Sequence, residues 1–169
     1  SAGIVSVFRS IATAGTLTTA SFQTRVDFTA ASPSGPLTLA DIDGDGRLDI
    51  ALAFGGANSA SGVIVLRNNA TSGSVTSGSF AAGVSFSIPN SPARLAVGDV
   101  SGDGNIDLVL AARASDVVSV FRNTSTSGSI TTSSFAAKVD FATGAFPEYL
   151  AVGDLDGDGR PDVVIPNYN

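Results

Sequence analysis

The hydrophobic residues of this chain fall into short runs of about four to seven residues, which glycine, serine, threonine, asparagine and proline separate. Valine, isoleucine and phenylalanine are frequent in these runs, and such residues favour strands. No window shows the sustained apolar period of about 3.6 residues that a helix would need. The pattern therefore predicts an all-β protein.

One succession of segments occurs three times, with a period of roughly 55 residues. Each copy holds an apolar segment, a Ser-Phe pair, a second apolar segment and an aspartate-rich turn. The copies align at Phe8, Leu66 and Phe121 in the first segment, at Phe22, Phe80 and Phe135 in the Ser-Phe pair, and at Asp41, Asp99 and Asp154 at the start of the turn. Their length varies after the turn, as in residues 53–62 against 111–116, which predicts an exposed hairpin tip there.

Four strands fit into each repeat. The first is predicted at residues 37–40, 95–97 and 150–152, and the second, after the aspartate turn, at 48–54, 106–111 and 162–165. The third and fourth are segments such as VSVFR and VDF. The first two strands are almost wholly apolar, so we expect both of their faces to be buried, whereas the outer two alternate and should be wetter. Four-stranded sheets repeated in this way describe propeller blades, with a three-fold β-solenoid or a trefoil-like barrel as alternatives.

The phase of the repeat divides the chain into an outer half blade at residues 1–30, blades at 37–90 and 94–143, and an inner half blade at 148–169. Three blades are too few to surround an axis, because propellers have about four to eight. Two chains placed head to tail would complete both half blades. The predicted fold class is therefore an all-β propeller of about three four-stranded blades per chain, closing to six blades as a homodimer. An excised part of a longer propeller is the alternative.

The aspartate-rich turns read DIDGDGRLD, DVSGDGNID and DLDGDGRPD. Each places oxygen-bearing side chains at positions 1, 3, 5 and 9, and glycine at position 6, where the chain must bend sharply. With the backbone carbonyl of position 7, these oxygens would cage a hard cation. The predicted ligands are Asp41, Asp43, Asp45, Arg47 and Asp49 in the first turn, Asp99, Ser101, Asp103, Asn105 and Asp107 in the second, and Asp154, Asp156, Asp158, Arg160 and Asp162 in the third.

Calcium is the predicted ion, with about three per chain, since magnesium rarely occupies cages built from protein groups alone. The turns are not helical EF-hands, because position 12 holds Leu52, Leu110 or Ile165 in place of glutamate. The alternative is that the aspartates only form local turns and bind no ion. Ser101 replaces a carboxylate by a hydroxyl group, so the second site should bind calcium most weakly.

Composition restricts the remaining chemistry. Cysteine and histidine are absent, which excludes disulfides and argues against zinc, iron or copper sites. Most of the 15 acidic residues belong to the turns. There is no clustered basic face for nucleic acid and no apolar run long enough to span a membrane. No catalytic residue is predicted, because a cation explains every aspartate cluster better.

Two further sets of residues recur in the repeat. The arginines are predicted to lie on solvated outer strands with their stems packed, or to line a ligand surface, and the phenylalanines are predicted to pack between blades. These sets are Arg9, Arg67 and Arg122, and Phe22, Phe80 and Phe135.

The segments DIDGDGRLDIALA, DVSGDGNIDLVLA and DLDGDGRPDVVIP resemble the calcium-binding loops of FG-GAP (VCBS-type) repeats. Such repeats build the β-propeller of integrin α-subunits and of many secreted bacterial proteins. The resemblance covers essentially the whole chain. It implies a propeller with one calcium ion per blade, in the hairpin between the first two strands, and an extracellular location.

The expected function is that of a non-enzymatic, calcium-binding scaffold for adhesion or interaction, which self-assembles into a closed ring and presents its faces to a protein or glycan ligand. One alternative is a lectin-like glycan-binding module, against which a glycan array without hits would count. A fragment of a larger extracellular propeller is a second alternative. An enzyme with calcium-dependent polysaccharide chemistry is the third and has the least support, because no acid or base stands outside the cation sites.

Overall fold

The computed structural model describes residues 3–31, 34–55, 61–88 and 94–168. Most of the hairpin tip predicted within 53–62 lies outside the described residues, as do the extreme ends of the parts predicted at 1–30, 37–90 and 148–169. The described residues contain no helix, hence none that could cross a membrane, and all their strands pair antiparallel, so the all-β prediction is confirmed. The strands are β1 (Gly3–Val7), β2 (Val26–Ala30), β3 (Ser34–Ala40), β4 (Asp49–Phe54), β5 (Gly62–Leu66), β6 (Val84–Ser87), β7 (Arg94–Gly98), β8 (Asp107–Ala112), β9 (Val117–Phe121), β10 (Val139–Ala142), β11 (Ala151–Gly153) and β12 (Asp162–Val164).

The strands form two four-stranded sheets and two two-stranded ribbons. The first sheet has the order β3-β4-β5-β6, and the second sheet runs from β7 to β10 in the same way, so strands that follow one another along the chain pair. The N-terminal ribbon consists of β1 and β2, and the C-terminal ribbon of β11 and β12. The sequence repeat extends to the register, because Ala51 pairs with Val65 in the first sheet and Val109 with Val120, at the same places of the repeat, in the second.

The predicted first and second strands agree with the observed ones to within a few residues. The predicted burial of the first strands is wrong, and so is the prediction that the third strands are wetter. The second and third strands are the buried ones, since β4, β5 and β8 consist almost wholly of buried residues. In contrast, Leu37 and Leu39 of β3 are exposed, and β7 is mostly half-buried. The physical reason is position within the sheet. The two central strands have a neighbour on each edge, whereas the first strand is itself an edge.

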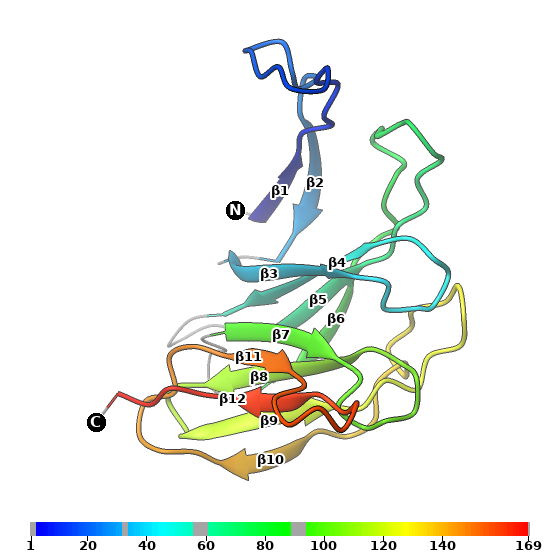
Figure 1. The fold of residues 1–169 in the computed structure, drawn as a ribbon. Helices are drawn as coiled ribbons and strands as arrows, with labels where there is room; N and C mark the ends of the chain where they lie inside the picture. The colour runs from blue at the N-terminus through cyan, green and yellow to red at the C-terminus, as the bar shows by residue number, and fades with distance from the viewer. Residues whose placement is uncertain (1–2, 32–33, 56–60, 89–93, 169) are drawn as a thin grey trace.

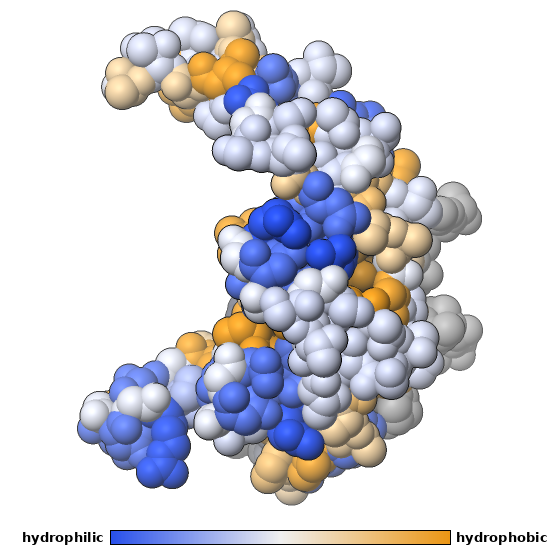
Figure 2. Space-filling view, turned by 90° about the vertical axis from the view of Figure 1, so that its right-hand side faces the viewer, coloured by the Kyte–Doolittle hydropathy of each residue, from blue (hydrophilic) through white to orange (hydrophobic). Residues whose placement is uncertain are grey.

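The sheets and ribbons are arranged in a crescent (Figures 1 and 2), with the N-terminal ribbon at one end. The first strands β3, β7 and β11 follow one another along the crescent in direct contact. Figure 2 shows the concave side of this crescent open. Four-stranded antiparallel sheets that stack around an arc in this way are consistent with a propeller-like fold.

Hydrophobic residues pack at each junction between neighbouring sheets. Val63 and Val65 of β5 pack with Leu108 and Leu110 of β8 between the two sheets. At the other junction, the N-terminal ribbon contributes Val5 and Ala30, which pack on β4 and β5 of the first sheet. The cores therefore lie between sheets, and each sheet depends on the next for the burial of its faces.

Pairs of aromatic rings pack against each other at these junctions. Phe86 meets Phe135 edge to face with ring centroids 4.8 Å apart, and Phe28 meets Phe80 in the same way at 4.9 Å. The prediction that Phe80 and Phe135 pack between sheets is therefore confirmed. For Phe22 it is wrong in the described structure, because this ring is half-exposed and belongs to neither hydrophobic core cluster of the described residues.

Candidate metal centre

The aspartate turns are the hairpins that join the first and second strands of the two sheets and of the C-terminal ribbon. They leave their strands on the same side of the crescent (Figure 1). Asp41 follows β3 directly, and Asp49 is the first residue of β4. The glycines at position 6 have φ values of 86°, 89° and 86°, in the left-handed region that favours glycine. These residues, which make the predicted sharp bend, are Gly46, Gly104 and Gly159.

The aspartate at position 1 is held by the backbone of its own turn. Asp41 accepts the N–H of Asp45 at 2.9 Å through one oxygen and the N–H of Gly46 at 2.8 Å through the other. The second turn repeats both bonds, from Asp103 and Gly104 to its first aspartate. The backbone thus fixes this carboxylate inside the turn, where a bound ion would need it.

The aspartate at position 9 is buried in the turns of both four-stranded sheets, and in the first turn Asp43 is buried as well. Asp49 and Asp107 are fully buried. Asp49 Oδ2 accepts the N–H of Ile42 at 3.1 Å, and Oδ1 accepts the N–H of Asn68 at 2.7 Å. Burial raises the pKa of Asp49; the Asn68 bond opposes this rise and the nearby charge of Asp43 adds to it. A cation beside Asp49 would favour its charged form again.

Carboxylate oxygens from positions 1, 3 and 9 converge in two of the turns, where one oxygen of each residue lies within 4.8 Å of the others. Two oxygens bound to one calcium ion at about 2.3–2.6 Å can be up to about 5 Å apart, so both clusters fit such an ion. In the second turn, where Ser101 holds position 3, the described residues form no cluster of three acidic groups. The two clusters are Asp41, Asp43 and Asp49, and Asp154, Asp156 and Asp162.

The structure does not bring the aspartates of position 5 into these clusters. Asp45 instead faces Arg47 and Arg67, whose Nη2 atoms lie 2.5 Å and 3.1 Å from Asp45 Oδ2. Asp103 accepts hydrogen bonds from the backbone and side chain of Asn105 and from Arg122, and the Asn105 N–H contributes most to the lowering of its pKa. Coordination through position 5 and through the position-7 carbonyl oxygens stays a prediction, which concerns Asp45, Asp103 and Asp158, and Arg47, Asn105 and Arg160.

Arg67 is a charged neighbour of the first turn that the sequence pattern alone did not reveal. Its Nε lies 2.5 Å from Asp43 Oδ2, and the Asp43 carboxylate raises the pKa of the guanidinium. The interpretation as a solvated outer-strand residue is therefore wrong for Arg67. Arg122 reaches the second turn in a similar way, through Asp103 at 3.3 Å. The sequence feature that could have revealed this role is their shared place in the repeat, because it puts an arginine near the end of each third strand.

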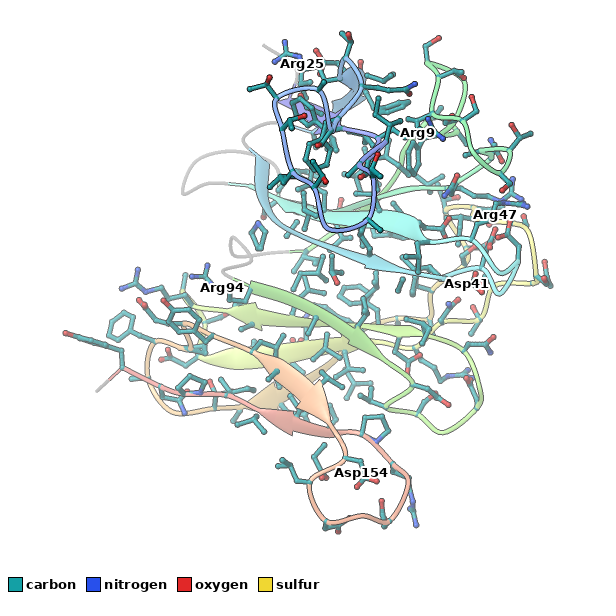
Figure 3. All side chains as sticks on the ribbon, turned by 45° about the horizontal axis from the view of Figure 1, so that its top comes forward. Arg9, Arg25, Asp41, Arg47, Arg94 and Asp154 are labelled. Carbon is teal, nitrogen blue, oxygen red and sulfur yellow. The ribbon has the colours of Figure 1, made fainter. Side chains whose placement is uncertain are left out.

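The third turn keeps only some of the internal bonds, since Asp154 Oδ1 accepts the N–H of Gly157 where Asp41 Oδ1 accepts that of Asp45, and it lies in a more open environment. Leu155 donates its N–H to Asp162 Oδ2 at 2.9 Å, as Ile42 does to Asp49. In the part of the chain that the structure describes, Asp162 Oδ1 has no hydrogen-bond partner, whereas Asp49 Oδ1 has the N–H of Asn68. Figure 3 shows the third turn, marked by Asp154, projecting from the end of the crescent, away from the first turn.

Comparison with known proteins gives one result. The family model of the FG-GAP-like repeat matches residues 41–110 and 99–165. Both matches begin at an aspartate turn, and together they cover most of the chain. Searches of curated proteins and of solved structures found no match.

Proposed function

Since the chain belongs to the family of FG-GAP-like repeat proteins, we propose that it is a calcium-binding propeller module that serves as a non-enzymatic scaffold for adhesion or interaction. The observation that carries the calcium assignment is the convergence of Asp41, Asp43 and Asp49, whose oxygens lie within 4.8 Å of one another. Like charges at this separation oppose folding unless a cation or a basic group balances them. Arg67 supplies part of that balance in the first turn.

Calcium would tie the first strand to the second in each hairpin. Asp41 follows the end of β3 and Asp49 begins β4, so an ion bound to both would fix the geometry of that hairpin. An ion that binds the folded chain and not the unfolded one raises the free energy of unfolding by mass action. Affinities of about 10⁻⁴–10⁻³ M would suit an extracellular module, and an extracellular location agrees with the usual setting of the family.

Isothermal titration of the metal-free chain with calcium, and then with magnesium, tests this assignment. We expect about three calcium ions per chain, weaker binding of magnesium, and a fall in melting temperature when a chelator is added. An Asp41→Asn variant should lose one ion. Arg25→Ala is the matched control, because Arg25 forms an exposed ion pair with Asp27 far from the turns. A chain that binds no calcium and melts at the same temperature in chelator would contradict the proposal.

The scaffold role includes self-association. The two ribbons at the ends of the crescent are half-size relative to the two sheets, and the proposed assembly is a homodimer that closes a ring of six blades. Light scattering on a sizing column tests the stoichiometry, with an expected mass of twice 16.8 kDa in calcium. A monomer at that mass of 16.8 kDa would contradict the closed ring.

A further inference from the structure

The two ribbons have complementary free edges. In the first sheet β4 pairs with β5, and in the second β8 pairs with β9. The strand β12 occupies the place of β4 and β8 in the repeat, and β1 occupies the place of β5 and β9. Within the described residues, however, β12 pairs only with β11, and β1 pairs only with β2.

We propose that β1 of one copy pairs antiparallel with β12 of a second copy, and that the residues after β1 complete the third aspartate turn of that copy. This inference rests on the self-associating, calcium-binding function proposed above. The register follows from the complete sheets. Ala51 pairs with Val65 in the first sheet, and the same places of the repeat are Val164 in β12 and Val7 in β1. Val164 of one copy therefore faces Val7 of the other.

Each end of the crescent has a groove that the other end would fill. The groove at the N-terminal end has a volume of about 420 Å³ and lies between β1 and the first sheet. The groove at the C-terminal end has a volume of about 440 Å³ and lies between the second sheet and β12. Both are mainly apolar, and their linings include Val5, Leu37 and Ile50 at the first end and Val120, Phe141 and Val163 at the second.

Exposed apolar side chains at the two ends are the repeat counterparts of buried ones in the middle. Between the two sheets, Phe86 is 8% and Phe135 is 9% exposed. Their counterparts Phe141 and Phe22 are 53% and 48% exposed, and they lie at opposite ends of the crescent. Head-to-tail pairing would bring Phe141 of one copy against Phe22 of the other, in the arrangement that Phe86 and Phe135 already show. Unpaired apolar edges of this kind favour association with a matching edge.

The third aspartate turn lacks groups that a second copy would supply. Asp49 Oδ1 accepts the N–H of Asn68, and Asp107 Oδ1 accepts the N–H of Asn123 at 2.8 Å. The residue at this place of the repeat in the N-terminal segment is Ser10, so its N–H would reach Asp162 Oδ1 of the partner copy.

The arginine that follows Phe8 or Leu66 in the repeat also shows that the third turn lacks a partner group. Arg67 contacts Asp43 and Asp45, and its counterpart Arg9 has no ion pair within the described residues. Arg9 of one copy would therefore lie against the third turn of the other. A second copy fits this site better than an unrelated partner does, because each end carries the residues that the other end lacks.

Disulfide trapping tests the pairing, since the natural chain has no cysteine. Two single variants, Val7→Cys and Val164→Cys, are mixed in calcium under mild oxidation. Side chains directly opposite in a sheet have Cβ atoms about 4.5–5.5 Å apart, close to disulfide range, so a linked pair of chains is expected. The matched control is Ser6→Cys mixed with Val164→Cys, which is one residue out of register and on the opposite face. No link between positions 7 and 164, or an equal link in the control mixture, overturns the proposal.

A charge reversal tests the completion of the third turn. Arg9→Glu should raise the dissociation constant of the dimer at least about tenfold, because it places a carboxylate against the acidic turn. Arg25→Glu on the same ribbon should change it less than about twofold, and an equal effect of both variants would overturn the role of Arg9. These experiments distinguish a failure of the strand-pairing proposal from a failure of the proposed calcium function. Calcium binding without a link between positions 7 and 164 overturns the pairing alone, whereas that link without calcium binding overturns the calcium function alone.

Discussion

Phe86 of the first sheet and Phe135 of the second meet edge to face, with ring centroids 4.8 Å apart and planes at 80°. Phe28 and Phe80 repeat this contact one junction earlier, at 4.9 Å and 75°. The second ring of each pair belongs to the Ser-Phe motif of the repeat. The phenylalanine of this motif thus packs between neighbouring sheets. In the second sheet it lies in a loop that is held by an isolated β-bridge between Asn123 and Phe135.

Removal of the phenylalanine ring of the Ser-Phe motif should change the stability of the chain by different amounts in different repeats. Phe135→Ala should lower the free energy of unfolding by about 3 kcal/mol, because the buried ring leaves a cavity between the sheets. Phe22→Ala is the matched control, since Phe22 has the same place in the repeat and is half-exposed. Its effect should be below about 1 kcal/mol in the monomer. Denaturant unfolding at low concentration measures both, and equal losses would contradict the role of the junction.

The second calcium site should respond to one substitution. Ser101→Asp restores a carboxylate at position 3, where the other two turns have Asp43 and Asp156. An added negative ligand raises calcium affinity, so we expect the weakest binding step to tighten roughly tenfold. Calorimetric titration of this variant beside the natural chain measures the change. Unchanged affinities would show that Ser101 does not limit the second site.

The bend at position 6 should not tolerate a side chain. Gly46 has a φ of 86°, and a Cβ there would meet no atom within 4 Å, so the effect of substitution is purely conformational. Gly46→Ala should cost about 1–2 kcal/mol of stability and weaken calcium binding in the first turn. Gly153→Ala is the control, because a Cβ at Gly153 also meets no atom within 4 Å and its φ lies outside the left-handed region. Thermal unfolding in calcium should separate the two variants.

Arg67 should stabilise the calcium-free chain more than the calcium-bound one. Its guanidinium balances the charge of Asp43, whose side chain is fully buried. Arg67→Ala should therefore lower the melting temperature in chelator strongly and in calcium less, so that the difference between the two conditions widens. Arg25→Ala, which removes an exposed pair with Asp27, should leave this difference unchanged. A narrower difference in the Arg67 variant would contradict the assigned role.

Calcium stabilisation should depend on pH through Asp49. Burial raises the pKa of Asp49 above that of the unfolded chain. In chelator, its contribution to stability is therefore fully present below the unfolded pKa and is lost as pH rises through the raised pKa. Calcium needs the charged carboxylate, so the gain in melting temperature from calcium should shrink as pH falls from neutral to about 4.

Asp49→Asn serves as the control for this effect. In chelator its melting temperature should vary less with pH than that of the natural chain, because the amide does not titrate. Melting curves across this range in calcium and in chelator give both comparisons. A calcium gain that is the same at about pH 4 as at neutral pH would rule out the proposed competition between proton and ion.

The sequence by itself determined the strands, the repeat and the turns, because these depend on local chemistry. Short runs of β-branched and aromatic residues specify strands, and the glycine at position 6 of each aspartate-rich turn specifies a sharp bend, which has a φ of 86° at Gly46. The three-fold recurrence of the aspartate pattern also identified the candidate ligands at positions 1, 3 and 9, which the structure brings together in the first and third turns.

Only the tertiary structure decided which strands are buried and which groups surround each turn. The strands β3 and β4 both contain runs of apolar residues, yet Leu37 is 52% exposed and Leu52 is buried. The reason is that burial depends on neighbours that come from other parts of the chain. In the same way, Arg67 and Asn68 reach the first turn only because β5 pairs with β4 and ends beside it. A single repeat specifies its own strands and turn, but its burial and the partners of its aspartates come from strands distant in sequence, and only the assembled sheets fix those.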